Sequence, residues 1–392
     1  VSAASALGKA PSSPLRARRA WIAVLLPFPI LVFVGQLLAE NPGEGPWLFP
    51  LVNVAMVSLP SIAIALFVAG RYHEANPLSW PISRREFSSG FVYGAVGATT
   101  VAGIINTIYI FAAGTILVDR YGADVPFRDF DTALRTLPRG WGIFLDLTTI
   151  SVVAPLNEEF WKGMLVAFFF FRKGGAARCF VWGVLAGAGF NLLETFSNSL
   201  AAVSPEAAAD TTLGSEWWFF ALARTGTAAM HATATGLVAL GFYGAFRRRP
   251  EYLGGLVAGP LIHAAWNFLV YCVWGDGFLT GAGPDSRWLD LLGGAGLIAL
   301  FVATVLLLWA FSGRLRDDAP AHIYRLIGMA PAGVARRLER PPQAPAVIEG
   351  AWADAAGLSS YGPPRTAGSG PGGTLATSAR GSTQKRIGVS PA

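Results

Sequence analysis

The sequence predicts an all-α, polytopic integral membrane protein with about eight transmembrane helices and both termini in the cytoplasm. Hydrophobic residues make up 53% of the 392 residues and charged residues only 14%, whereas an average soluble domain carries about 25% charged residues. Apolar runs of about 20 residues, the length that crosses a bilayer as a helix, recur up to position 311. These observations predict a multi-pass protein of the cell membrane.

The predicted spans share an apolar stretch long enough to cross the bilayer. They are residues 21–39, 47–70, 89–118, 141–171, 179–200, 217–246, 252–274 and 289–311. The third and fourth runs exceed the length of one straight crossing, so each is expected to tilt or break. The first run is too long for the apolar core of a typical signal peptide, and we interpret it as a retained anchor.

The basic residues orient these spans independently of hydropathy, because Lys and Arg are enriched in cytoplasmic loops. Basic clusters precede the first span and follow the second, fourth and sixth, at 16–19, 71–85, 172–178 and 247–249. The loops around 40–44 and 206–210 contain acidic residues but no Lys or Arg. This alternation places both ends of the chain in the cytoplasm.

The chain is therefore divided into three parts. Residues 1–20 form a cytoplasmic N-terminal segment, 21–311 a transmembrane helical domain, and 312–392 a cytoplasmic tail. The tail is rich in Pro, Gly, Ala and Ser, so it is expected to be mostly disordered. The cytoplasmic segments account for the net charge of +6, and interleaved basic and aromatic residues are missing, so no nucleic-acid partner is expected. The lipid bilayer is the expected surrounding.

Two adjacent glutamates, Glu158 and Glu159, lie in one of the most hydrophobic stretches of the chain. A carboxylate near a bilayer centre costs about 2.5–3.5 kcal/mol on insertion scales, and a neighbouring carboxylate adds repulsion. Because of this cost, such a pair is not expected to serve a structural purpose alone. It indicates a functional site inside the membrane.

Ionisable residues in four predicted spans share one depth. Counted at about 1.5 Å per helical residue from the cytoplasmic basic clusters, one residue of each span lies roughly 20–24 Å deep, namely Glu158, Glu194, His231 and His263. Because neighbouring spans run in opposite directions, a shared depth predicts a single intramembrane cluster. Its members are Glu158, Glu159, Lys162, Glu194, Arg224, His231 and His263.

Helical spacing places several of these residues on common faces. Lys162 is four residues after Glu158 and three after Glu159, so it is expected to cover the pair. Asn267 is four residues after His263, so both side chains are expected to project from one face of their helix. The same holds for Glu194, four residues after Phe190. Arg224 and His231 are two turns apart and also share a face.

Pro155 is expected to kink or break its span just before the glutamates. Asn157 would then be the N-cap of the following helix, and the glutamates would lie in the first turn of that helix.

A glutamate pair with two histidines and an asparagine suits the activation of water. One glutamate would act as general base on water attacking a peptide carbonyl, while His263 and Asn267 polarise that carbonyl. Alternatively, Glu and His side chains would hold a zinc ion that activates the water. The chain has no HExxH or paired-Cys motif, so the sequence alone does not require a metal.

Two other classes of protein remain as alternatives. Intramembrane Glu, His and Arg residues also form proton relays, and a helix broken at Pro155 suits a substrate site, so a proton-coupled transporter is the main alternative. The sequence has no inverted repeat, which favours the protease. A catalytically silent scaffold is the third interpretation, and it predicts that replacing Glu158 and Glu159 leaves function intact.

Four short motifs within residues 140–275 resemble those of the PrsW family of intramembrane proteases. In order, they are EExxK at 158–162, GxGFxxxE at 187–194, the spaced Arg and His at 224 and 231, and HxxxN at 263–267. The wider CAAX prenyl endopeptidase-like superfamily typically shows EExxxR and FxxxH instead. Thr195 stands where the PrsW family often has Asn.

The resemblance implies a glutamic-type intramembrane protease with its catalytic core at about 141–275. It implies that the substrate is a membrane-anchored protein, of which anti-sigma factors are an example. The leading catalytic residues would be Glu158, Glu159, His231, His263 and Asn267. Four further residues would position the site or balance charge, namely Lys162, Phe190, Glu194 and Arg224.

Overall fold

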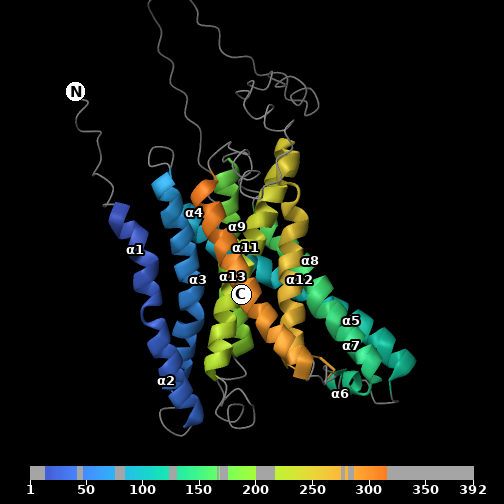
Figure 1. Ribbon diagram of the computed structural model, residues 1–392. Helices are drawn as coiled ribbons and strands as arrows, with labels where there is room; N and C mark the ends of the chain where they lie inside the picture. Colours follow the sequence, from blue (N-terminus) through green and yellow to red (C-terminus); the bar gives the residue numbers. More distant parts are fainter. Residues whose placement is uncertain are drawn as a thin grey trace, which may run out of the picture. The chain divides into compact units, whose positions relative to one another are not determined.

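The computed structural model describes residues 14–41, 47–75, 84–122, 130–165, 167, 175–199, 217–274, 279–280 and 287–315. All regular secondary structure in these ranges is helical, which confirms the all-α prediction (Figure 1). The chain divides into two compact units, Val1–Ala335 and Arg336–Ala392, and every described residue belongs to the first. The predicted disordered tail began at residue 312, but residues 312–314 belong to the last helix, and the tail from residue 316 onward lies outside the described residues.

Six helical stretches in the described part of the chain are long and apolar enough to cross a membrane. They are Arg19–Glu40, Leu48–Arg71, Arg85–Tyr121, Ala176–Ser199, Pro250–Val273 and Arg287–Ser312. Each coincides with one of the eight predicted spans. The fourth and sixth predicted spans are also helical but are not among the six, and these two carry five of the seven clustered ionisable residues.

The first two apolar runs form three helices. The run at 21–39 is divided into α1 (Pro14–Leu25) and α2 (Phe28–Glu40), and α3 (Leu48–Ala75) follows. Pro27 is the N-cap of α2 and has no N–H to continue the α1 ladder, which explains the division. Pro60 lies inside α3.

The long third run bends through a π-helical turn. It comprises α4 (Arg84–Val92), the π-turn η2 (Tyr93–Ala98) and α5 (Thr99–Tyr121). A short helix, α6 (Phe130–Arg135), follows.

The fourth run was expected to kink or break at Pro155, but it stays helical there and changes to a π-turn just before the proline. It comprises α7 (Arg139–Thr148), the π-turn η3 (Thr149–Val153) and α8 (Ala154–Leu165). Pro155 cannot donate to the carbonyl four residues earlier, and its ring crowds that carbonyl, so the wider π-turn accommodates it. The predicted N-cap was wrong, because Asn157 lies inside α8 and the glutamates lie in its second turn.

Two buried helices form the centre of the described bundle. They are α9 (Ala176–Ser199) and α11 (Trp217–Arg247), which pack against each other. A Cβ at Gly187 would collide with the His231 carbonyl, and one at Gly183 with the Thr235 carbonyl. Glycines therefore allow the two backbones to approach closely, as small residues do in membrane helices.

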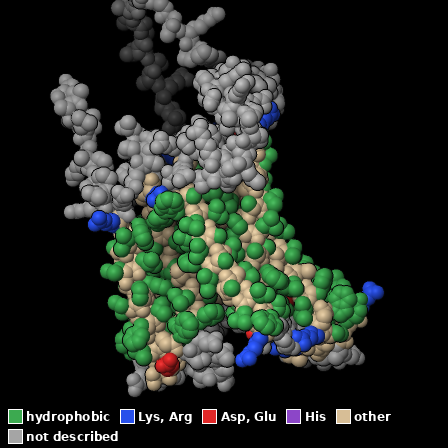
Figure 2. All heavy atoms as spheres, viewed as in Figure 1, with side chains coloured by type: hydrophobic (Ala, Val, Ile, Leu, Met, Phe, Trp, Pro, Cys, Tyr) green, Lys and Arg blue, Asp and Glu red, His purple; other side chains and the backbone are tan. Residues whose placement is uncertain are grey.

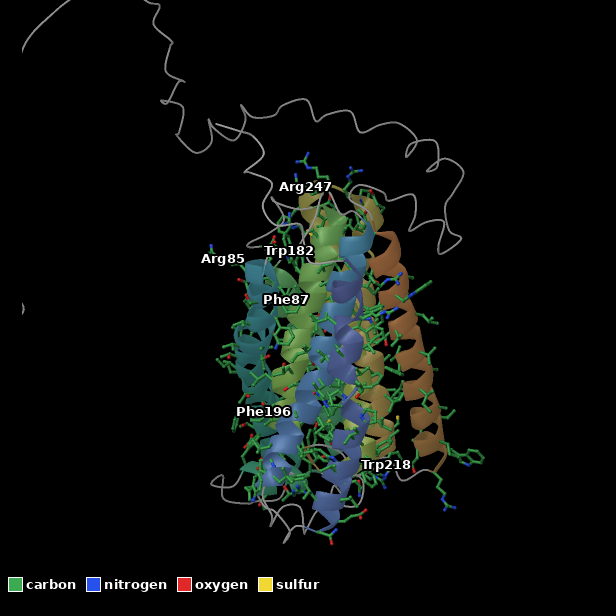
Figure 3. All side chains as sticks on the ribbon, turned by 90° about the vertical axis from the view of Figure 1, so that its left-hand side faces the viewer. Arg85, Phe87, Trp182, Phe196, Trp218 and Arg247 are labelled. Carbon is green, nitrogen blue, oxygen red and sulfur yellow. The ribbon has the colours of Figure 1, made fainter. Side chains whose placement is uncertain are left out.

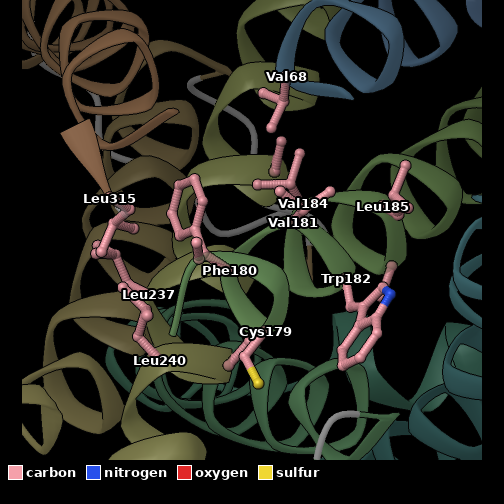
Figure 4. Close-up of a cluster of buried hydrophobic side chains, with 14 of the residues drawn as sticks. Val68, Cys179, Phe180, Val181, Trp182, Val184, Leu185, Leu237, Leu240 and Leu315 are labelled. Carbon is pink, nitrogen blue, oxygen red and sulfur yellow. The ribbon is translucent and has the colours of Figure 1, made fainter. Parts of the chain in front are cut away.

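The apolar core surrounds this crossing. Figure 4 shows Phe180, Val184 and Leu237 among its side chains, all of them buried. The 3-10 turn η6 (Pro250–Tyr252), α12 (Gly255–Trp274) and α13 (Arg287–Arg314) complete the bundle, with α12 and α13 packed against α11.

The outer faces of the helices are apolar. Hydrophobic side chains cover the middle of the face seen in Figure 2, and most of the charged side chains visible there lie towards its two ends. Ile108, Leu261 and Ile298 lie in candidate spans, and each of these side chains is more than 60% exposed. Large exposed apolar side chains in this band suit contact with lipid.

Candidate active site

Helix α8 places the glutamate pair next to a buried lysine. Lys162 Nζ lies 2.5 Å from Glu159 Oε1 and 3.7 Å from Glu158 Oε2, so it covers both carboxylates as the helical spacing predicts. The Lys162 and Glu159 side chains are fully buried, whereas Glu158 retains 11% exposure. A charge in such a place requires a partner, and each of these has one.

Glu159 is held from three sides. Besides Lys162, the Thr235 hydroxyl donates a hydrogen bond to Oε2 at 2.7 Å, and His263 Nδ1 lies 3.0 Å from Oε1. Both carboxylate oxygens therefore have partners, contributed by α8, α11 and α12. This carboxylate is locked in place.

Glu158 is held on one oxygen only. Asn106 on α5 donates to Oε1 at 3.2 Å, but the buried Oε2 has no hydrogen-bond partner among the described residues. His263 Nε2 lies 3.8 Å from this Oε2. An unpaired carboxylate oxygen is costly in a low-dielectric interior, so it indicates a group that binds something during function.

Two asparagines fix the orientation of Glu158. Asn157 donates to the Ala102 carbonyl at 2.9 Å and to Asn106 Oδ1 at 2.8 Å, which leaves the Asn106 amide directed at Glu158. The sequence motifs did not identify Asn106. A signal was present, because Asn106 is a side-chain amide within the otherwise strongly apolar run of α5.

His231 connects the lysine to a second charged pair. Lys162 Nζ donates to His231 Nδ1 at 2.9 Å, and His231 Nε2 lies 2.8 Å from Glu194 Oε2. Arg224 forms an ion pair with the same Glu194 oxygen at 2.9 Å. Arg224 also donates from Nε to the Thr195 hydroxyl, so the residue that departs from the family pattern takes part in the network.

Phe190 closes the cluster on its apolar side. Lys162 Nζ lies 4.1 Å from the centre of the Phe190 ring, a cation–π distance, and the His231 ring lies 5.3 Å from it. The aromatic ring thus contacts the lysine and the histidine together. It shields their hydrogen bond from competing polar groups.

Asn267 lies one turn from His263 on α12, as expected, but its amide faces the π-turn. Its Nδ2 donates to the Ile150 carbonyl at 2.9 Å. Ile150 belongs to η3, where the π-turn and Pro155 disturb the regular helical ladder. In this arrangement Asn267 secures the segment that leads into the glutamates.

The charges of the cluster do not balance. At their formal charges, three carboxylates (Glu158, Glu159, Glu194) face two cations (Lys162, Arg224), which leaves one negative charge in excess when the histidines are neutral. The unpaired oxygen belongs to Glu158. The site therefore suits a cation or a proton at this carboxylate.

Glu158, His231 and His263 also form a candidate metal site. Each offers a ligand atom, and these atoms lie within 4.8 Å of one another. Two imidazoles and a carboxylate are a donor set of catalytic zinc in hydrolases. Glu159 behind His263 Nδ1 provides the carboxylate that commonly orients a metal-binding histidine.

One contact must change if a metal binds. Both ring nitrogens of His231 have partners in this structure, Lys162 and Glu194, so one of them has to be released. The oxygen of Glu158 and Nε2 of His263 need no such exchange. The residues present thus fit a zinc ion, with this one rearrangement at His231.

Comparison with known proteins agrees with this geometry. Residues 83–310 match the PrsW-protease family, described as PrsW family intramembrane metalloprotease. Searches of curated proteins and of solved structures gave no match. The family match confirms the resemblance of the four motifs and favours a peptidase over a transporter or a silent scaffold. The match covers more than half of the chain, including all the clustered residues, so this multi-pass membrane protein belongs to the PrsW family of intramembrane metalloproteases.

Proposed function

We propose that the enzyme hydrolyses a peptide bond of a membrane-anchored protein, with Glu158 as the carboxylate at the reacting centre. One observation carries this assignment: Glu158 Oε2 is buried and accepts no hydrogen bond from the described residues, with only the longer ion-pair contacts to Lys162 at 3.7 Å and His263 Nε2 at 3.8 Å. A water molecule beside Oε2 and Nε2 could donate a hydrogen bond to Oε2 and contact Nε2 as well. The side chain of Glu158 also retains some exposure, whereas that of Glu159 has none.

Glu159 is assigned a positioning role. Each of its oxygens has a partner, with Lys162 and His263 at Oε1 and Thr235 at Oε2, and its side chain is fully buried, so it is less accessible to a reactant than Glu158. Its contact with Nδ1 orients the His263 ring and leaves Nε2 directed at Glu158. Adjacent glutamates thus take different roles because the surrounding helices satisfy only one of them.

Zinc is the proposed metal, held by Glu158, His231 and His263. When bound there, a zinc ion activates water and polarises the scissile carbonyl. The excess negative charge of the cluster favours a divalent cation at this place. Lys162 and Arg224 form ion pairs with the remaining carboxylates, and the Phe190 ring packs against Lys162.

The role of Asn267 is proposed to be positional. Its amide binds the Ile150 carbonyl, so it stabilises the π-turn and, through that turn, the direction of α8. Glu194 and Arg224 are likewise proposed to hold His231.

We further propose eight membrane crossings with both ends of the chain cytoplasmic. The helices at 139–165 and 217–247 would add two crossings to the six candidates, since their polar residues face one another inside the bundle. Figure 3 shows Arg85 and Arg247 at one end of the helices and Trp218 towards the other, as the positive-inside rule requires. The core would then be residues 141–275, with 1–20 and 312–392 as cytoplasmic segments.

The proposed substrate is a membrane protein with a single span, such as an anti-sigma factor. The test uses the purified full-length enzyme in liposomes with a tagged panel of single-span membrane proteins. Wild type is compared with Glu158→Gln, Glu159→Gln and His263→Ala, each with and without a zinc chelator. Zinc bound per protein is measured in parallel.

We expect Glu158→Gln and His263→Ala to abolish cleavage and lower bound zinc, and chelation to stop the wild type. Glu159→Gln should retain measurable cleavage at a reduced rate, because it disturbs orientation only. Cleavage that is lost in the glutamate variants but indifferent to the chelator would replace the metal with direct catalysis by glutamate. Equal cleavage by all variants would remove this cluster from the mechanism.

A further inference from the structure

A second cavity lies on the opposite side of α11 from the catalytic cluster. It has a volume of about 210 Å³ and is lined by side chains of α1, α3, α11 and α13. Thr225 and Ala229 of α11 face this cavity, whereas Arg224 and His231 face the cluster. Ala229 and His231 are two residues apart, which places them about 200° apart around the helix.

The lining is almost entirely apolar. Ile64 and Phe67 of α3 and Val305 and Leu308 of α13 contribute to it, together with Trp21 of α1. An apolar cavity of about 150 Å³ is sufficient to take up a molecule the size of benzene. The cavity is therefore large enough for a hydrocarbon segment and offers little to a polar ligand.

An arginine contacts the aromatic ring of one residue that lines this cavity. The Arg71 guanidinium lies 5.7 Å from the ring centre of Phe67, which lines the cavity, and 5.1 Å from that of Trp309, which follows Leu308. Its Nε is buried and has no hydrogen-bond partner among the residues that the structure describes. The position combines an apolar space with an unsatisfied cationic donor.

The length of α3 along this cavity matches one leaflet. Pro60 lines the cavity eleven residues before Arg71, which is about 16 Å along a helix. Half of a hydrocarbon core measures about 15 Å. Arg71 is thus at the level of lipid headgroups when Pro60 is near the bilayer midplane.

We propose that this cavity binds a glycerophospholipid, with an acyl chain along α3 and the phosphate on Arg71. The chemistry is complementary, because a guanidinium forms charge-assisted hydrogen bonds with phosphate oxygens. The lipid fills the space between helices α1 and α3, which precede residue 83, and helices α11 and α13 within the family match. It supports α11 from the side opposite His231.

The test measures lipid bound to delipidated full-length protein by native mass spectrometry. The probes are phosphatidylglycerol, diacylglycerol with the same chains, and inorganic phosphate as a competitor. Two variants change the cavity: Arg71→Gln removes the cation, and Val305→Trp fills the space. Two matched controls change neighbours that do not line it, Arg85→Gln at an exposed arginine and Leu306→Trp at an exposed position of α13.

Wild type and both controls should bind one phosphatidylglycerol, and both cavity variants should bind it at least fivefold more weakly. Diacylglycerol should bind more weakly than phosphatidylglycerol to the wild type and to both controls, since it has no phosphate for Arg71, and this preference should be lost in Arg71→Gln. Size-exclusion profiles check that every variant is folded. Equal binding by cavity variants and controls would overturn the proposal, as would displacement of the lipid by inorganic phosphate.

Discussion

At the scale of single residues, two adjacent carboxylates have different environments. Glu159 accepts hydrogen bonds on both oxygens, and Glu158 on one. The difference arises from neighbouring helices, because Thr235 and His263 form hydrogen bonds with Glu159, whereas Asn106 alone among the described residues donates one to Glu158. The two glutamates are therefore expected to have different roles in catalysis.

Thr235→Val should reduce activity without greatly reducing stability. The substitution removes the hydroxyl that donates to Glu159 Oε2 and leaves a side chain of the same shape. Loss of one hydrogen bond to a charged group costs about 1.5–3 kcal/mol, so we expect about a tenfold or greater fall in kcat/KM. The measurement is the cleavage rate of a single-span substrate in liposomes.

Thr233→Val provides the matched control for this prediction. Thr233 is fully buried on the same helix, and its hydroxyl donates to the Thr304 carbonyl instead of to the cluster. A similar loss of activity in both valine variants would contradict a specific role for Thr235.

Asn106→Ala should lower kcat more than it raises KM. The amide holds Oε1 of Glu158 and so sets the direction of the unpaired Oε2. Zinc affinity, measured with a fluorescent chelator, should fall as well, since a rotated carboxylate binds a metal less well. Kinetics with varied substrate separate the two constants.

Asn53→Ala is the corresponding control. Asn53 is a buried asparagine that donates to the Ser199 hydroxyl at 2.9 Å, away from the glutamates. It should cost thermal stability comparable to that lost in Asn106→Ala and leave zinc affinity unchanged. Equal losses of zinc affinity in the two variants would mean that Asn106 has a structural role and no specific role at the site.

At the scale of elements, the π-turn η3 and the α9–α11 crossing direct the site. The π-turn lies between α7 and the catalytic helix α8, and Asn267 binds a carbonyl within it. The crossing brings Glu194 on α9 to His231 on α11. Both features depend on backbone approach and on proline geometry more than on side-chain hydrophobicity.

Gly187→Leu should prevent the native contact between α9 and α11. A Cβ at this position collides with the His231 carbonyl, which belongs to backbone and cannot move aside. We expect a loss of folded protein, seen as aggregation on size exclusion, and a loss of cleavage. Gly103→Leu is the control, because a Cβ there meets nothing within 4 Å, and it should remain folded and active.

At the scale of the whole molecule, the charged groups are drawn inward while the lipid-facing surface stays apolar. The six candidate spans are the described helices that are long and apolar enough to cross a membrane. The helices at 139–165 and 217–247 are more polar because they supply most of the cluster. Hydropathy therefore selects six candidate spans among the described residues, and the two helices that carry most of the cluster are not among them.

Reporter fusions test the proposed eight crossings. A fluorescent protein that matures only in the cytoplasm should be bright when fused after Arg71 and after Arg247, and dark when fused between residues 206 and 210. A periplasmic alkaline phosphatase should give the opposite pattern. A cytoplasmic signal from the 206–210 fusion would contradict the proposed orientation of α9 and α11.

The sequence by itself determined the membrane class, the approximate spans and the membership of one cluster. Apolar run length and the positions of Lys and Arg are local properties of the chain, and helical spacing relates residues on the same helix. The pairing of Lys162 with both glutamates could therefore be predicted before any contact was known.

Only the tertiary structure decided which carboxylate is left unpaired and which groups hold the other. The contacts of Asn106 with Glu158 and of Thr235 with Glu159 join residues 52 and 76 positions apart. Helical periodicity shows which way a side chain points on its own helix, but not which neighbour it meets. For the same reason, Asn267 was expected to face the substrate carbonyl but binds Ile150, because the π-turn before Pro155 presents its carbonyl there.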